Sequence, residues 1–244
     1  MRVSVDGFLN HQLRIAQPVR GWRAGLDAVL LASAVAARPR DMVCEFGTGS
    51  GAAALCAVWR TRAQLVGVEK NAALADLARA NAERNQLAAR VEIRTLDIAA
   101  RDFLAALAPL RFAHVFFNPP WYAPRRVRAS PSPARQEAQL RADEPGVWVR
   151  RAASLLRAHG TLTMIDRADA LADILAQLTP AFGAIRLLPV LPRAGRAAHR
   201  VLVQARLGRR APLRLLPPLI LEDAEGAPTQ AAHAILRGGQ ALAL

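Results

Sequence analysis

The residues with the clearest chemical potential form the stretch Asn118-Pro119-Pro120-Trp121, which follows an apolar run over residues 114–117. Proline cannot donate to a strand ladder and fixes its own φ, so a strand over the apolar run must stop here. The side-chain oxygen of Asn118 and the main-chain carbonyl of Pro119 could both accept hydrogen bonds from an amino group, while Trp121 stacks on a flat substrate. Such acceptors would point the lone pair of a weakly nucleophilic, conjugated amine at an electrophile. The alternative is a plain proline turn that caps the strand.

A glycine-rich loop earlier in the chain would need to lie beside this stretch. It reads Glu45-Phe46-Gly47-Thr48-Gly49-Ser50-Gly51 and joins an expected buried strand over residues 42–46 to an expected helix over residues 52–59. Glycines at a strand-to-helix turn let the backbone come close to a ligand at the helix N-terminus. The spacing also satisfies the dinucleotide pattern Gly-x-Gly-x-x-Ala. The loop therefore predicts a nucleotide-like ligand.

Acidic residues follow the next two expected strands, over residues 65–68 and 91–96, which flank a helix over residues 72–85. Glu69 stands at the distance expected for an acid that holds both ribose hydroxyls, and Asp97 could accept from an adenine amino group. Either acid alone could be a solvated strand terminus. Because parallel strands present their carboxyl ends at one edge of the sheet, we expect both acids to meet the glycine loop and Asn118 there.

Asp27 has two possible roles. It directly precedes an expected helix over residues 28–37, so it could be the N-cap of that helix. It could instead place a carboxylate at the mouth of the site. Both interpretations remain open at the level of sequence.

The composition indicates a globular protein with a polyanionic partner. The 244 residues are 52% hydrophobic and 21% charged, and 33 basic against 19 acidic residues give a net charge of +14. Such an excess favours RNA, DNA or an anionic membrane surface. Lys70 is the only lysine, however, and abundant arginine and alanine would also follow from a GC-rich genome.

The remaining sequence features point to an ordinary cytoplasmic protein. Cys44 and Cys56 lie in apolar segments and read as small core residues, and no Cys/His spacing suggests a metal site. No stretch resembles a signal peptide or reaches membrane length. We therefore expect a cytoplasmic protein without a bound metal and without membrane association.

Taken together, these motifs resemble the class I S-adenosylmethionine-dependent methyltransferases, in the branch that methylates amino nitrogens through an Asn/Asp-Pro-Pro-aromatic loop. The resemblance covers residues 20–205 and rests on Glu45-x-Gly47-x-Gly49-x-Gly51, Glu69, Asp97 and Asn118-Pro-Pro-Trp121. A finer resemblance is to the tRNA1(Val) (adenine(37)-N6)-methyltransferase family, seen in segments 25–31 and 193–203. That family usually has tyrosine where this chain has Trp121. It also leads us to expect a tyrosine followed by an acid near residues 228–233, where the chain has neither.

The resemblance implies roles for the matching residues, with S-adenosyl-L-methionine as the cofactor. The glycine loop would lie under its methionine part, Glu69 would hold the ribose, and Asp97 the adenine amino group. The cofactor-binding set is Asp27, Glu45, Gly47, Thr48, Gly49, Gly51, Glu69, Asp97 and Asn118. The catalytic set is Asn118, Pro119, Pro120 and Trp121.

Arginine-rich segments near this site are the candidates for binding a nucleic acid, in particular tRNA. They lie in the polar stretch over residues 123–145 and between two late strands expected over residues 184–191 and 200–205. A solvated surface loop is the alternative for the first segment, and phosphate contact is the function that the arginines favour. The substrate-binding candidates are Arg125, Arg126, Arg128, Arg196, His199 and Arg200.

The expected fold is α/β, a Rossmann-like class I methyltransferase fold with a seven-stranded, mostly parallel sheet and a terminal antiparallel strand. We expect a methyltransferase domain over residues 1–206. Residues 207–244 would be a C-terminal extension that packs on this domain or is partly flexible. A monomer is the favoured state.

Three functions remain open. The first is transfer of a methyl group to adenine N6 in tRNA, at position 37 of the anticodon loop. The second keeps the chemistry but places it on rRNA or on a protein glutamine, although glutamine-modifying relatives carry a substantial helical domain before the glycine loop. The third is a nicotinamide-dependent oxidoreductase or a non-catalytic nucleotide-binding module. The oxidoreductase gives no role to Asn118-Pro-Pro-Trp121.

Overall fold

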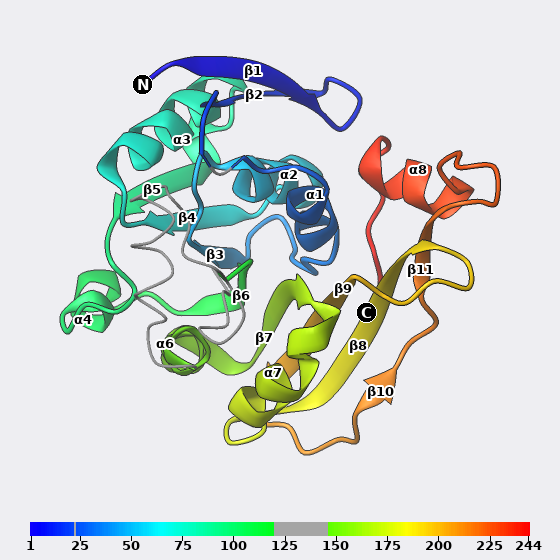
Figure 1. The fold of residues 1–244 in the computed structure, drawn as a ribbon. Helices are drawn as coiled ribbons and strands as arrows, with labels where there is room; N and C mark the ends of the chain where they lie inside the picture. Colours follow the sequence, from blue (N-terminus) through cyan, green and yellow to red (C-terminus); the bar gives the residue numbers. More distant parts are fainter. Residues whose placement is uncertain (22, 120–145) are drawn as a thin grey trace, which may run out of the picture.

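The computed structural model describes residues 1–21, 23–119 and 146–244. Its centre is a sheet of nine strands among these residues (Figure 1). The first part of the sheet has the order β5 (Val91–Thr95), β4 (Gln64–Glu69), β3 (Met42–Phe46), β6 (Phe112–Phe117) and β7 (Leu156–Arg167). It continues with β9 (Arg200–Leu207) and β8 (Phe182–Arg193), and β9 runs antiparallel to both of its neighbours. These seven strands confirm the expected α/β fold with a mostly parallel sheet.

Two short strands from the C-terminal segment extend the expected sheet. β10 (Arg214–Leu215) and β11 (Leu219–Glu222) both pair in parallel with β8. They occupy the outer edge of β8, which would otherwise expose its unpaired backbone groups. The segment then forms α8 (Gln230–Leu236), and the Leu242 amide donates to the Ser33 carbonyl over 2.9 Å. The C-terminal segment therefore packs against the same sheet and against α1, and the boundary at residue 206 stays a prediction.

Helices cover both faces of the sheet. One face carries α1 (Leu26–Ser33), α2 (Ala52–Thr61) and α8 over one buried cluster, and α3 (Ala72–Arg84) packs nearby against β5. The other face carries α4 (Phe103–Leu107), α6 (Val147–Leu155) and α7 (Leu171–Leu178) over a second cluster. Strands buried on both faces read as continuous apolar runs, which is why the sequence showed them clearly. No described helix is long and apolar enough to cross a membrane.

A separate two-stranded hairpin closes the N-terminal side of the molecule (Figure 1). It consists of β1 (Val3–Phe8) and β2 (Leu13–Pro18), which pair in antiparallel register. Its anchor is Asn81 of α3, which is fully buried. The Asn81 side chain exchanges two 2.8 Å hydrogen bonds with the Ala16 backbone and donates a third, over 2.9 Å, to the Ser50 carbonyl of the glycine loop.

Candidate active site at the carboxyl edge of the sheet

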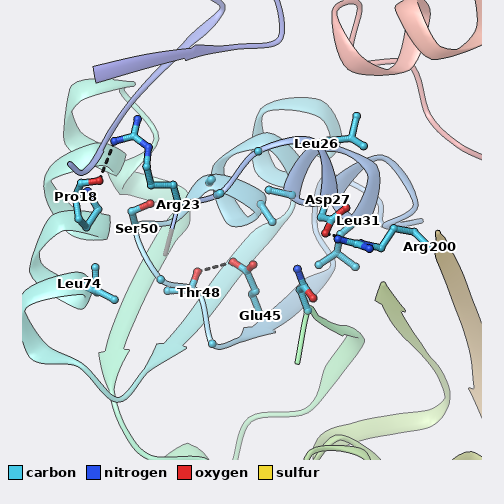
Figure 2. A pocket seen from close by; sticks show the side chains of 18 residues that line it. Pro18, Arg23, Leu26, Asp27, Leu31, Glu45, Thr48, Ser50, Leu74 and Arg200 are labelled. Atoms are coloured by element: carbon cyan, nitrogen blue, oxygen red, sulfur yellow. Dashed lines mark hydrogen bonds and ion pairs between the residues drawn. The ribbon is translucent and has the colours of Figure 1, made fainter. Parts of the chain in front are cut away.

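A cavity of about 380 Å³ lies at the carboxyl ends of the parallel strands (Figure 2). Three parts of the chain form its wall: the segment between the hairpin and α1, the glycine loop with the start of α2, and single residues from α3, β9 and the end of β6. The lining residues are Pro18, Arg23, Ala24, Gly25, Leu26, Asp27, Ala28, Leu31, Glu45, Gly47, Thr48, Gly49, Ser50, Ala52, Ala53, Leu74, Asn118 and Arg200.

The backbone of the glycine loop explains its residue types. Gly47 and Gly49 have φ values of +66° and +56°, a region that side chains strongly disfavour. A Cβ atom on Gly47 would also lie 2.7 Å from the Trp148 ring of α6. The loop is closed by a 2.8 Å hydrogen bond from the Gly51 amide to the Thr48 carbonyl. A bare backbone surface therefore faces the cavity at the beginning of α2.

Glu45 lies at the floor of the cavity, one residue before the end of β3. Its side chain is almost fully buried and accepts a hydrogen bond from the Thr48 hydroxyl (Figure 2). Burial raises the pKa of the Glu45 carboxyl to about 8, and the nearby charge of Glu69 adds a smaller rise. A cation in the cavity would favour the charged form of Glu45, because an opposite charge stabilises a carboxylate.

Asp27 lies in the first turn of α1, so the N-cap interpretation is wrong. Helix α1 begins at Leu26, and Gly25 occupies the N-cap position. The Asp27 carboxylate lines the cavity instead and forms a 2.9 Å ion pair with Nε of Arg200 on β9 (Figure 2). The second interpretation, a carboxylate at the mouth of the site, agrees with this position. The pair also places Arg200 on the cavity wall.

Asn118 follows the last residue of β6 and lines the cavity, next to the buried Pro119. Phe117 pairs in register with Phe46 of β3, so the chain beyond β6 leaves the sheet beside the glycine loop. The structure thus brings Asn118 and the loop to one cavity, as the sequence predicts. Five further candidates lie outside the described residues: Pro120, Trp121, Arg125, Arg126 and Arg128.

Glu69 and Asp97 lie along the same edge of the sheet, beyond the cavity wall. The two carboxylate oxygens of Glu69 accept from the amides of Gly49 and Asn71, each over 2.9 Å. Asp97 follows β5 and accepts from the Ala99 amide over 2.9 Å. Gly51 does not line the cavity either. Glu69 therefore borders the glycine loop at the end of β4, and Asp97 lies two residues beyond the end of β5.

Arg196 and His199 are exposed in the turn between β8 and β9 and do not line the cavity. They lie in the turn that precedes Arg200, but only Arg200 of the three lines the cavity. A contact of Arg196 and His199 with nucleic acid stays a prediction.

Three lining residues had no signal in the sequence. Pro18 and Arg23 reach the cavity because the hairpin folds back onto α3, and Leu74 reaches it from the first turn of α3. The Arg23 guanidinium donates to Ser4 Oγ and to the Pro18 carbonyl, both over 2.8 Å, and pairs with Asp6. These are long-range contacts of a hairpin, and no local spacing reports them.

Comparison with known proteins agrees with this geometry. The family described as "Methyltransferase small domain" matches residues 24–188. The tRNA1(Val) (adenine(37)-N6)-methyltransferase of Actinobacillus succinogenes is 30% identical over 203 residues, which are 81% of this chain and 82% of that protein. The release factor glutamine methyltransferase of Moorella thermoacetica is 34% identical over 161 residues, 62% of this chain and 54% of that protein. The crystal structure of a predicted O-methyltransferase from Agrobacterium tumefaciens superposes with a TM-score of 0.75 at 28% identity, covering 89% of this chain and 99% of that one.

The residues present also suit the cofactor of such enzymes. A sulfonium cofactor with an amino-acid end needs acidic groups and a close backbone surface, and the cavity offers Glu45, Asp27 and the glycine loop. The strand order with its single antiparallel strand, the cavity and the match over residues 24–188 all lead to one conclusion. The chain belongs to the methyltransferase small domain family and is an S-adenosylmethionine-dependent methyltransferase.

Proposed function

We propose that the protein transfers a methyl group to N6 of an adenine in tRNA, at position 37 of the anticodon loop. The observation that carries this proposal is the position of Asn118, whose carboxamide lines the same cavity as the glycine loop. A hydrogen-bond acceptor beside the glycine loop favours an amino group as the target, because an amino group can donate N–H bonds to it. The 30% identity to a tRNA adenine-N6 methyltransferase over most of both chains supports the choice of target.

The cofactor would occupy the cavity and the adjoining edge of the sheet. The backbone of Gly47, Thr48 and Gly49, which line the cavity with Glu45, would lie under its methionine part. Gly51 would support this loop through its hydrogen bond to Thr48. Glu69 would accept from the ribose hydroxyls, because it borders the glycine loop at the end of β4. Asp97 would accept from the adenine amino group, because it follows the neighbouring strand β5 at the same edge of the sheet. When bound, the cofactor supplies a methyl group that its sulfonium already activates.

The residues at the end of β6 would orient the target amine. The Asn118 side-chain oxygen and the Pro119 carbonyl would accept its two N–H groups, which leaves the nitrogen lone pair free for the methyl carbon. Held in this way, the amine would accept the methyl group as the cofactor's S–C bond breaks, and its extra proton would pass to water. Positioning alone can lower such a barrier by about 7 to 11 kcal/mol at best. Pro120 would make this loop rigid, and Trp121 would stack on the target base.

Binding of tRNA would rest on the basic surface. The net charge of +14 favours phosphate contacts, and the candidates for them are Arg125, Arg126, Arg128, Arg196 and His199. An anticodon-loop adenine suits the mechanism, because a base in a loop can leave its stack more easily than a base in a duplex. Its substrate would place the enzyme in the cytoplasm, and we expect it to act as a monomer.

A protein glutamine is the second candidate target. Its side-chain amide is also a conjugated amino group, and a release factor glutamine methyltransferase is 34% identical over 161 residues. That match covers only 54% of the relative, whereas the match to the tRNA enzyme covers 82% of it. The coverage and the basic charge both favour tRNA.

The test is a methyl-transfer assay with radiolabelled S-adenosylmethionine, offering total tRNA, ribosomal RNA and a release-factor preparation separately. Labelled RNA is then digested to nucleosides. We expect label in tRNA, recovered as N6-methyladenosine. Label confined to ribosomal RNA or to glutamine of the release factor would replace the proposed substrate, and cofactor binding without any transfer would indicate a non-catalytic binding module.

A further inference from the structure

We propose that Arg200 binds the α-carboxylate of the cofactor's methionyl end, and that Asp27, its ion-pair partner, binds the α-ammonium. This inference rests on the cofactor alone and does not depend on tRNA as the substrate. It moves Arg200 from the nucleic-acid surface, where the sequence placed it, into the cofactor site.

The first reason is position. Asp27 comes from α1 and Arg200 from the start of β9, and the fold brings them together across 173 residues of sequence. Both line the cavity that the glycine loop and Glu45 also line. Figure 2 shows the two side chains pointing at each other at one end of the cavity, with Glu45 and Thr48 at its floor. A ligand whose sulfonium lies near Glu45 would present its amino-acid end to this pair.

The second reason is the hydrogen-bonding capacity that the pair keeps. The Nε of Arg200 donates to Oδ2 of Asp27 over 2.9 Å, and its Nη1 donates to the carbonyl of the preceding residue, His199, over 3.2 Å. In the part of the chain that the structure describes, Nη2 of Arg200 and Oδ1 of Asp27 have no hydrogen-bond partner. A free guanidinium donor beside a free carboxylate oxygen is complementary to a zwitterionic amino acid, because each group meets its opposite charge.

The third reason is that the other guanidinium of the cavity wall is engaged elsewhere. The terminal nitrogens of Arg23 donate hydrogen bonds to Ser4, Pro18 and Asp6 of the hairpin. Within the described residues, three of the five N–H groups of Arg23 are thus held by the hairpin, whereas Arg200 uses two of its five and keeps both N–H groups of Nη2. The adjacent carboxylate of Asp27 also makes Arg200 a poorer site for an isolated phosphate, since it would repel that anion.

Ligand truncation combined with mutation tests the assignment without any methyl transfer. Dissociation constants are measured calorimetrically for S-adenosylhomocysteine, for its decarboxylated analogue, and for methylthioadenosine, which lacks the whole amino-acid end. We expect Arg200→Gln to weaken S-adenosylhomocysteine by at least tenfold, and to leave the other two ligands within about twofold. The loss of one charge-assisted contact to the carboxylate accounts for a change of this size.

Arg167→Gln is the matched control. Arg167 lies opposite Arg200 in the register of β7 and β9, pairs with Asp169, and does not line the cavity. It should leave all three dissociation constants unchanged. Arg200→Lys, which keeps the charge beside Asp27, should recover part of the affinity for S-adenosylhomocysteine and serves if the glutamine variant does not fold.

Two results would overturn the assignment. One is unchanged affinity for S-adenosylhomocysteine in the Arg200 variants, and a simultaneous loss of tRNA affinity would then return Arg200 to the nucleic-acid surface. The other is an equal loss for S-adenosylhomocysteine and methylthioadenosine, which would mean that Arg200 only maintains the shape of the cavity.

Discussion

Asn118 is the residue on which the proposed chemistry depends, because its carboxamide faces the cavity from the end of β6. We expect Asn118→Ala to lower the transfer rate by roughly 100-fold or more, since the target amine loses an orienting acceptor. The dissociation constant of the cofactor should change by less than about threefold, because the glycine loop and the acids remain. Single-turnover transfer and calorimetric binding measure the two quantities separately. Loss of both in equal measure would assign Asn118 to cofactor binding instead.

Glu45 should make the stability of the cofactor-free protein depend on pH. Its carboxyl has a pKa of about 8 in the folded protein and an ordinary value of 4.5, so between these values the folded state holds a proton that the unfolded chain has released. Raising the pH through this window therefore destabilises the protein. Glu45→Gln removes this titration. The difference in free energy of unfolding, variant minus wild type, should therefore increase by on the order of 3 kcal/mol from pH 5 to pH 8.

The measurement is denaturant unfolding of both proteins at pH 5 to 8. Asp166, whose pKa burial raises to about 7, titrates in both proteins and cancels in the difference between them. Parallel pH profiles would show that Glu45 is already ionised in the folded protein.

At the scale of elements, the junction of the hairpin, α3 and the glycine loop depends on Asn81. Asn81→Ala would leave the Ala16 amide and the Ala16 and Ser50 carbonyls without their partner in a fully buried place. We expect a loss of about 2 to 4 kcal/mol in the free energy of unfolding and weaker cofactor binding.

Asn85→Ala is the control for this prediction. Asn85 makes the same pair of hydrogen bonds, at 2.8 and 3.0 Å, to the backbone of Arg14, but in an exposed place where water can replace it. Its loss should cost less than about 1 kcal/mol. Equal effects of the two substitutions on stability would contradict the anchoring role of Asn81.

Elements that depend on local chemistry were predicted from sequence, and elements that depend on distant contacts were not. The strands over Met42–Phe46 and Gln64–Glu69 and the glycine loop between them appear almost at the expected residues. Their apolar runs and their glycines report burial and turn geometry directly. Helix α1 starts two residues before the expected residue 28 and ends at Ser33, short of residue 37, where the chain turns toward β3.

The same contrast holds for the candidate site. The cavity contains Glu45, the glycine loop and Asn118 as expected, because strand ends of a parallel sheet share one edge. The sequence gives no signal of the pairing between Arg200 and Asp27, because the two residues are 173 positions apart; the role of Arg200 in binding nucleic acid stays untested. Arg23 was missed altogether, because its contacts with Ser4, Asp6 and Pro18 form only when the hairpin has folded.

At the scale of the whole molecule, two properties favour tRNA over the other proposed substrates. The chain has a net charge of +14, and its match to the tRNA enzyme of Actinobacillus succinogenes extends over 81% of its length. The C-terminal segment adds β10, β11 and α8 to the methyltransferase sheet, next to the turn that carries Arg196 and His199. We expect Arg196 and His199 to contact phosphates of the tRNA from this turn.

The most direct measurement is transfer to a transcript of the valine tRNA, followed by nuclease digestion and mass spectrometry to locate the methyl group. Our account predicts one N6-methyladenosine, at position 37, and no methylation of a transcript that carries guanosine at that position. Methylation of both transcripts, or of an adenine elsewhere, would contradict the proposed target, and methylation of neither by an enzyme that binds the cofactor would contradict tRNA as the substrate.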